Sequence, residues 1–130
     1  MANRSVPKSL RMWFVIHFLA DIAFAIPLIL VPVETLRIFG WTTIDPLATR
    51  LVGAALVGIG VESLLGRNAS IESFQTMLRL KILWSVSANI GIALTILQGA
   101  PRAAWIFQGI FVSFSALWIF YKYQLGKIGR

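Results

Sequence analysis

The chain has 130 residues, of which 58% are apolar and only 13% are charged, and its net charge is +7. Soluble domains carry about a quarter charged residues, so this chain has too few polar side chains to cover a surface exposed to water. The absence of cysteine excludes disulfides, cysteine-ligated metals and thiol redox chemistry, and the single histidine excludes a bis-histidine haem within one chain.

The first apolar segment, residues 12–31, is predicted to cross a membrane as a helix, because about 20 helical residues span the hydrocarbon layer. His17 and Asp21 interrupt it and share one helix face, since they are four residues apart. A charged side chain at this depth costs about 2.5–3.5 kcal/mol on insertion scales, so it needs a polar partner or a function. Both residues are candidates for a ligand or ion pathway, and a purely structural role stays open.

The second apolar segment is predicted to cross over residues 47–65. Residues 33–39 are expected to form amphipathic turns that end at Gly40, and Asp45 is the predicted N-cap of the second segment. Four residues at a spacing of four are expected to form one ridge that turns inward: Arg50, Ala54, Gly58 and Glu62. Arg50 and Glu62 are therefore further pathway candidates, and the glycines of this segment are predicted to let helices pack closely.

The third predicted span covers residues 75–97, and a polar ridge at a spacing of four is again expected to turn inward: Lys81, Ser85, Asn89 and Ala93. Asn89 is a pathway candidate. Arg79 and Lys81 are candidate ion-pair partners of Glu62, with extension of both side chains to the headgroups as the alternative.

The fourth predicted span covers residues 103–121 and carries no charge. Gln108 is its pathway candidate. A stripe of aromatic residues at helical spacing is expected to contact lipid or another subunit: Phe107, Phe111, Phe114, Trp118 and Tyr121.

The basic residues alternate along the chain. Nine belong to the N-terminus, the second connection with the start of the third span, and the C-terminus: Arg4, Lys8, Arg11, Arg67, Arg79, Lys81, Lys122, Lys127 and Arg130. The other side has Arg37 and Arg102, with Arg50 just inside the second span. The positive-inside rule then predicts that both termini lie on the cytoplasmic side of the membrane. The membrane is expected to be the plasma membrane, or the inner membrane in a prokaryote. Because the bases cluster at helix ends, nucleic-acid binding is not expected.

Short connections make sequential helices antiparallel neighbours. The predicted fold is therefore all-α, a single domain over residues 1–130 that forms an up-down four-helix transmembrane bundle. By depth, Asp21 is expected near Asn89, and Glu62 near Arg79 or Lys81, with Arg50 and Gln108 toward the outside.

The segment from Arg50 to Gly60, with the sequence RLVGAALVGIG followed by Leu64, Leu65 and Arg67, resembles the second helix of DoxX-like small four-helix integral membrane proteins. The resemblance covers under a fifth of the chain. It implies the same four-helix fold. Some members of that group are accessory subunits in quinone-linked sulfur oxidation, but the sequence has no match to a catalytic residue set, so the resemblance leaves the activity open.

The inward polar stripes favour an oligomeric channel or a proton-linked transporter, surrounded by lipid and assembled with copies of itself or another membrane protein. One alternative is an accessory subunit that docks through the aromatic stripe. Another is a bundle that binds a small apolar ligand such as quinone or lipid, with His17, Asp21 and Asn89 as anchors. No nucleophile–base pair, metal constellation or phosphate loop is evident, so neither enzymatic activity nor a cofactor is predicted.

Overall fold

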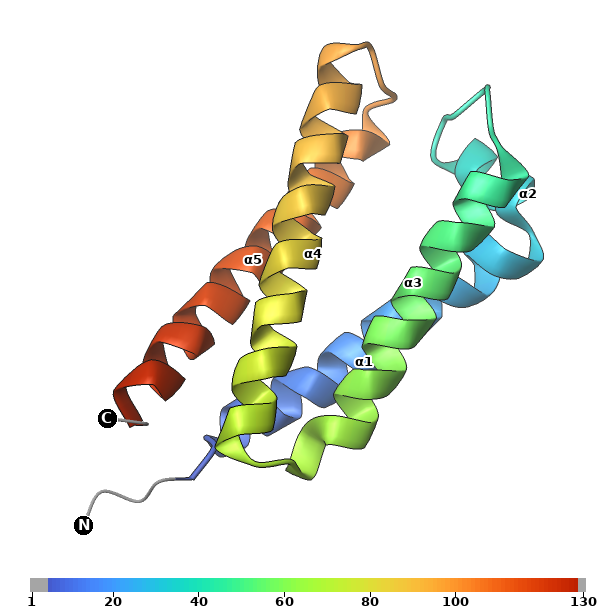
Figure 1. Cartoon of the computed structure of the whole chain (residues 1–130). Coiled ribbons are helices and arrows are strands. Elements are labelled where there is room, and N and C mark those ends of the chain that lie inside the picture. Colours follow the sequence, from blue (N-terminus) through green and yellow to red (C-terminus); the bar gives the residue numbers. More distant parts are fainter. Residues whose placement is uncertain (1–4, 129–130) are drawn as a thin grey trace. The chain divides into compact units, whose positions relative to one another are not determined.

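The computed structural model describes residues 5–128, so Arg4 and Arg130 of the charge pattern lie outside the described residues. Within that range every regular element is helical (Figure 1). The elements are α1 (Lys8–Leu30), α2 (Pro32–Ile38), α3 (Pro46–Leu65), the 3-10 turn η1 (Gly66–Asn68), α4 (Ile71–Leu97) and α5 (Ala103–Ile128). Four of these helices, α1, α3, α4 and α5, are long and apolar enough to cross a membrane, which suggests a multi-pass membrane protein.

Local sequence signals explain where the helices begin and end. Asp45 caps α3 by accepting a hydrogen bond from the Ala48 amide at 3.0 Å, as predicted. Ser70 caps α4 in the same way. Gly40 and Gly99 have φ angles of 97° and 96°, a conformation that glycine adopts without strain, and they form the turns after α2 and α4.

The helices extend past three of the predicted spans. α3 coincides closely with predicted residues 47–65, but α1 starts at Lys8, α4 starts at Ile71 and α5 continues to Ile128. Prediction of the spans relied on the apolar run, whereas a helix continues through polar residues until a cap or turn stops it. The helices are therefore longer than the predicted membrane-spanning segments.

The chain divides into two compact units. One contains residues 5–11 and 68–128, and the other contains residues 12–67. One boundary falls within α1, after Arg11, and the second falls within η1, after Arg67.

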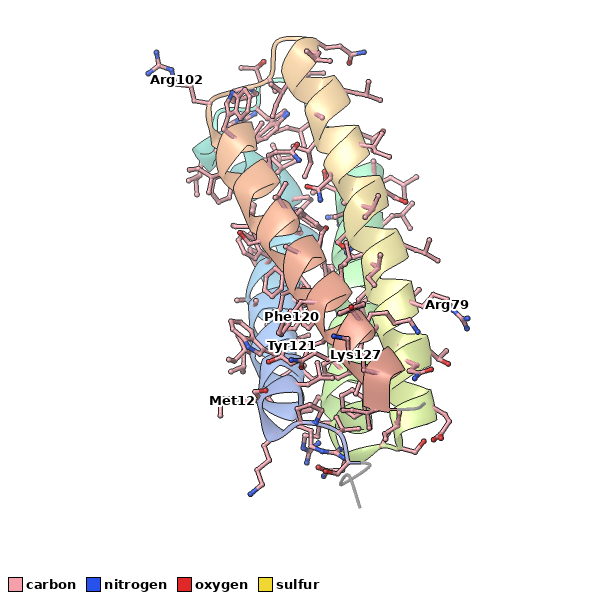
Figure 2. The ribbon with its side chains drawn as sticks, turned by 90° about the vertical axis from the view of Figure 1, so that its left-hand side faces the viewer. Met12, Arg79, Arg102, Phe120, Tyr121 and Lys127 are labelled. Carbon is pink, nitrogen blue, oxygen red and sulfur yellow. The ribbon has the colours of Figure 1, made fainter. Side chains whose placement is uncertain are left out.

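The unit of residues 5–11 and 68–128 is the α4–α5 hairpin together with the first turn of α1. The two long helices run in opposite directions, because the Lys122 ammonium donates to the Gln75 carbonyl at 3.2 Å whereas Trp84 meets Phe111 edge-on. Figure 2 shows Lys127 and Arg102 at opposite ends of α5 and Arg79 pointing away from α4. The unit has a core of fully buried side chains: Leu10, Phe74, Leu78, Trp118 and Leu125.

The first turn of α1 is tied to both long helices of this unit. The Tyr121 hydroxyl lies 2.9 Å from the Ser9 hydroxyl. The Arg11 guanidinium donates to the Ala69 carbonyl at 3.3 Å and lies 5.2 Å from the centre of the Phe74 ring. These contacts hold the start of α1 against the start of α4 and the last part of α5.

The unit of residues 12–67 pairs the rest of α1 with α3, and glycines make the contact. A Cβ atom at Gly53 would lie 2.7 Å from Ile29 Cγ1, and one at Gly60 would lie 2.8 Å from Asp21 Cβ. Both distances are shorter than side chains allow, so only glycine permits the observed approach. The order of the contacts shows that α1 and α3 run antiparallel. α2 is joined to the end of α1 by the Thr35 hydroxyl, which lies 3.1 Å from the Pro27 carbonyl of α1 and 2.7 Å from the Val31 carbonyl at the N-cap of α2.

Large apolar side chains are exposed along the long helices. On α4 alone these are Leu80, Leu83, Val86, Ile90, Leu94 and Leu97. Soluble proteins rarely expose so continuous an apolar face, and such a face is consistent with contact to a lipid bilayer.

Candidate functional site

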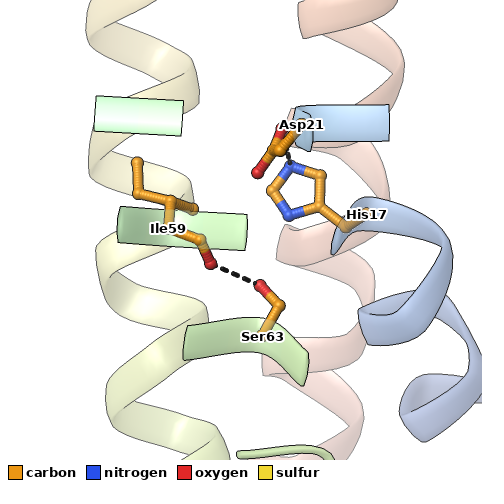
Figure 3. Close-up of polar contacts among 4 residues, drawn as sticks. All are labelled: His17, Asp21, Ile59 and Ser63. Carbon is orange, nitrogen blue, oxygen red and sulfur yellow. Dashed lines mark hydrogen bonds and ion pairs between the residues drawn. The ribbon is translucent and has the colours of Figure 1, made fainter. Parts of the chain in front are cut away.

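The most deeply buried ionisable pair of residues 12–67 lies on α1. His17 Nε2 is 3.3 Å from Asp21 Oδ1, and the two residues are only 5% and 7% exposed. The spacing of four residues places the side chains one helical turn apart on the same face, which is why the sequence alone predicts their contact. Figure 3 shows both side chains on the side of α1 that faces Ile59 and Ser63 of α3.

Small residues of α3 make room for this pair. Gly60 lies directly against Asp21, since the missing Cβ would be 3.3 Å from Asp21 Oδ2 as well as in contact with Asp21 Cβ. Ser63, one turn further along α3, is 1% exposed and donates its hydroxyl proton to the Ile59 carbonyl at 2.7 Å (Figure 3). Ser63 was not among the predicted site residues; its spacing of three from Gly60 was the available signal in the sequence.

The chemistry open to this pair is reversible proton binding. An imidazole and a carboxyl group each bind and release a proton, and in contact each affects the proton affinity of the other. Among residues 5–128, no group of three or more His, Cys, Asp or Glu side chains is placed to hold a metal ion.

The prediction that one ridge of the second span turns inward is wrong. Arg50, Ala54, Gly58 and Glu62 are all exposed, and nothing lies within 4 Å of a Cβ built at Gly58. The buried face of α3 is instead formed by Thr49, Gly53, Leu56, Gly60 and Ser63. Arg50 donates from Nε to the Ile29 carbonyl at 3.0 Å. Both faces of this helix contain small residues, and α1 packs on the face whose two glycines are seven residues apart.

A second polar cluster joins α4 to α5 in the other unit. Gln108 Nε2 donates to Asn89 Oδ1 at 2.7 Å, and Asn89 Nδ2 donates to the Ser115 hydroxyl at 3.0 Å. Ser115 in turn donates to the Phe111 carbonyl at 2.8 Å. We call Gln108, Asn89 and Ser115 the amide relay. The structure thus brings together two predicted pathway residues, Asn89 and Gln108.

Lys81 of α4 does not extend outward. It is 2% exposed, and its ammonium lies 4.9 Å from the centre of the Trp118 ring of α5. A lysine that reaches headgroups would be exposed, so that expectation is wrong for Lys81, whereas Arg79 is exposed. The attraction between a cation and an aromatic face keeps the ammonium within the helix pair.

The aromatic stripe of the fourth span faces inward, contrary to prediction. Trp118 and Tyr121 are buried, and Phe107, Phe111 and Phe114 are partly buried. Phe114 stacks on Trp118 with ring centres 5.6 Å apart. The exposed face of α5 carries Trp105, Ile106, Val112, Ile119, Phe120 and Tyr123 instead.

Two predicted pairings, of Asp21 with Asn89 and of Glu62 with Arg79 or Lys81, link residues of different units, and they stay predictions. No protein-family model, curated protein or solved structure matches the chain. The resemblance to DoxX-like proteins therefore also stays a prediction.

Proposed function

We propose that this chain is a membrane transport protein that binds and releases a proton at His17 and Asp21 as part of its cycle. The observation that carries the proposal is the contact between two buried ionisable side chains in a helix apolar enough to cross a membrane. Ionisable residues at such depth mark proton relays and ion pathways in membrane proteins.

A purely structural role explains the pair less well. Placing one charged side chain at the centre of a membrane helix costs about 2.5–3.5 kcal/mol on insertion scales. An interaction between polar groups of which one is charged contributes about 1.5–3 kcal/mol, which is comparable to the cost of placing that charge in the membrane. Two apolar residues at these positions would hold α1 against α3 with no insertion cost and with no need for a polar contact to offset it. The pair is then more simply understood as retained for proton exchange.

We further propose an up-down arrangement of the four long helices with both termini in the cytoplasm. The alternation of basic residues supports it, with nine on one side of the predicted topology. The resemblance of residues 50–60 to DoxX-like proteins favours the same arrangement. A homo-oligomer is part of the proposal, because four helices enclose little space. The exposed ridge of α3 with Arg50 and Glu62 suits a seam between subunits, where charged groups avoid lipid.

Proton flux into proteoliposomes tests the proposal. Purified protein is reconstituted with a pH-sensitive dye inside the vesicles, and a pH step is applied outside. Wild type is expected to dissipate the gradient faster than protein-free vesicles, and Asp21→Asn is expected to return the rate to that of protein-free vesicles.

Asp45→Asn is the matched control, because Asp45 is an exposed acid and asparagine caps helices as well as aspartate does. It should keep the wild-type rate. Equal rates for wild type and Asp21→Asn would refute the proposed role of the pair.

A further inference from the structure

Ser63 of α3 lies at the depth of His17 on α1. The two helices run antiparallel, and Gly60 of α3 lies against Asp21 of α1. From that contact, Ser63 is three residues further along α3, and His17 is four residues back along α1. A helix rises about 1.5 Å per residue, so the two steps end within about 1.5 Å of the same level. In Figure 3 the His17 ring extends from α1 toward α3, where Ser63 lies.

Toward His17, the Ser63 hydroxyl is available only as an acceptor. Its single proton is donated to the Ile59 carbonyl at 2.7 Å, so lone pairs of the oxygen remain for another partner. The His17 ring has two nitrogens, and Nε2 is the one that faces Asp21 Oδ1 at 3.3 Å. Nδ1 is therefore the ring nitrogen that Ser63 can bond, and Nδ1 must carry a proton to do so.

We propose that Ser63 is the positioning residue of the pair formed by His17 and Asp21, and that it acts by accepting a hydrogen bond from His17 Nδ1–H. The inference rests on the proposed function, because it names the residue that decides which ring nitrogen exchanges the proton. The hydrogen bond of one ring nitrogen sets the protonation of the other. With Nδ1 always protonated, only Nε2 gains and loses a proton, and it does so against Asp21.

This arrangement keeps the pair uncharged. A proton between Nε2 and Oδ1 gives either imidazolium with carboxylate or neutral imidazole with carboxylic acid, and both forms have no net charge. Without Ser63, a neutral His17 would turn its one N–H to the Asp21 carboxylate. The pair would then have a net negative charge in a helix apolar enough to cross a membrane, which is costly.

Release of the proton is coupled to the Ser63 contact for the same reason. While Ser63 holds Nδ1–H, loss of the shared proton leaves the Asp21 carboxylate facing the Nε2 lone pair, and the two repel. Once His17 separates from Ser63, the remaining ring proton can move to Nε2 and bond to the carboxylate. A shift of α1 relative to α3 is therefore the step that would let the pair release its proton.

The other charged groups of α2, α3 and η1 are turned elsewhere. The buried face of α3 carries no ionisable side chain. Arg67 of η1 is partly buried and donates to the Leu64 carbonyl at 2.6 Å. The charged side chains of α2 and α3 are exposed: Glu34, Arg37, Arg50 and Glu62. Ser63 is thus the polar side chain that this face of α3 places at the level of His17.

Nitrogen-15 NMR tests the inference on one residue, because His17 is the only histidine of the chain. Protein with a histidine-free tag is labelled with nitrogen-15 histidine, reconstituted in lipid bilayers and titrated with pH. In wild type, Nδ1 should stay protonated throughout, and only the Nε2 signal should shift. In Ser63→Ala, the neutral ring should keep its proton on Nε2, so the Nδ1 signal should shift instead.

Two further variants separate positioning from packing. Ser63→Thr keeps a hydroxyl that bonds the carbonyl one turn back, so it should give the wild-type pattern. Thr49→Val is the matched control, because Thr49 lies on the same buried face and its hydroxyl donates to the Asp45 carbonyl at 2.7 Å. It should also give the wild-type pattern. Loss of the Nδ1 proton in wild type would overturn the inference even if no variant folds, and so would a wild-type pattern in Ser63→Ala.

The NMR titration and the flux assay fail separately, because the titration is read at equilibrium and needs no transport. The expected NMR patterns without proton flux would refute the proposed function and support the Ser63 contact. Flux that depends on Asp21, together with loss of the Nδ1 proton in wild type, would refute the role of Ser63 alone.

Discussion

Substitutions at His17 and at Asp21 are expected to lower the free energy of unfolding by different amounts. Replacing His17 by leucine leaves the Asp21 carboxylate facing an apolar side chain, and the loss of one polar partner of a buried charged group costs about 1–3 kcal/mol. Asp21→Asn keeps an acceptor of the same shape for His17. We therefore expect His17→Leu to lower the free energy of unfolding clearly more than Asp21→Asn does, as measured by denaturant unfolding in mixed micelles with circular dichroism. An equal or larger loss of stability for Asp21→Asn would show that the polar contact with His17 is not what stabilises this part of α1.

The sequence placed Lys81 correctly on the polar ridge of α4 but not its side-chain direction. That direction depends on Trp118, which is distant in sequence and comes close only through the pairing of α4 with α5.

At the scale of the helices, the contact of α1 with α3 depends on which glycines it uses. Gly60→Ala would force a methyl group to within 2.8 Å of Asp21 Cβ, whereas Gly58→Ala meets nothing within 4 Å. Overpacking of this kind costs about 1–3 kcal/mol, and alanine in place of an exposed helical glycine gains about 1 kcal/mol. We expect Gly60→Ala to lower the thermal unfolding midpoint and Gly58→Ala to keep or raise it. Equal midpoints would show that the helices are not in close contact at Gly60.

The same glycines show how far sequence patterns predict helix packing. Apolar length indicated all four long helices, and two local predictions were also correct: Asp45 caps α3, and Gly40 forms the turn after the short helix α2. The spacing of four in the second span selected a ridge that is exposed. Gly53 and Gly60 lie on the other side of that helix, and a pattern of small residues alone does not decide between two such faces. The surface of the partner helix decides, and here Ile29 and Asp21 require the glycines.

For the whole molecule, the proposed topology makes the two sides of the membrane distinguishable. The chain has no cysteine, so single-cysteine variants report one position each. Thr43 and Asn68 are both exposed, in the segment before α3 and at the end of η1. An impermeant thiol reagent is expected to label Thr43→Cys on intact cells, and Asn68→Cys only after permeabilisation. Labelling of both positions on intact cells would contradict the proposed orientation.

The composition of the chain indicated the all-α class and the four helices that could cross a membrane, because too few polar residues remain to cover a soluble fold. The contact of His17 with Asp21 followed from a spacing of four within one helix. The amide relay did not follow in the same way, because Gln108 and Asn89 meet only through the pairing of two helices. Local spacing therefore predicts contacts within a helix better than contacts between helices.

Infrared difference spectroscopy across a pH titration tests most directly whether the buried pair binds a proton. The account predicts a carboxyl stretching band in wild type that changes reversibly with pH, is absent from Asp21→Asn and persists in Asp45→Asn. His17→Gln should shift the pH at which that band changes, because the two groups titrate together. A wild-type difference spectrum identical to that of Asp21→Asn would contradict the account.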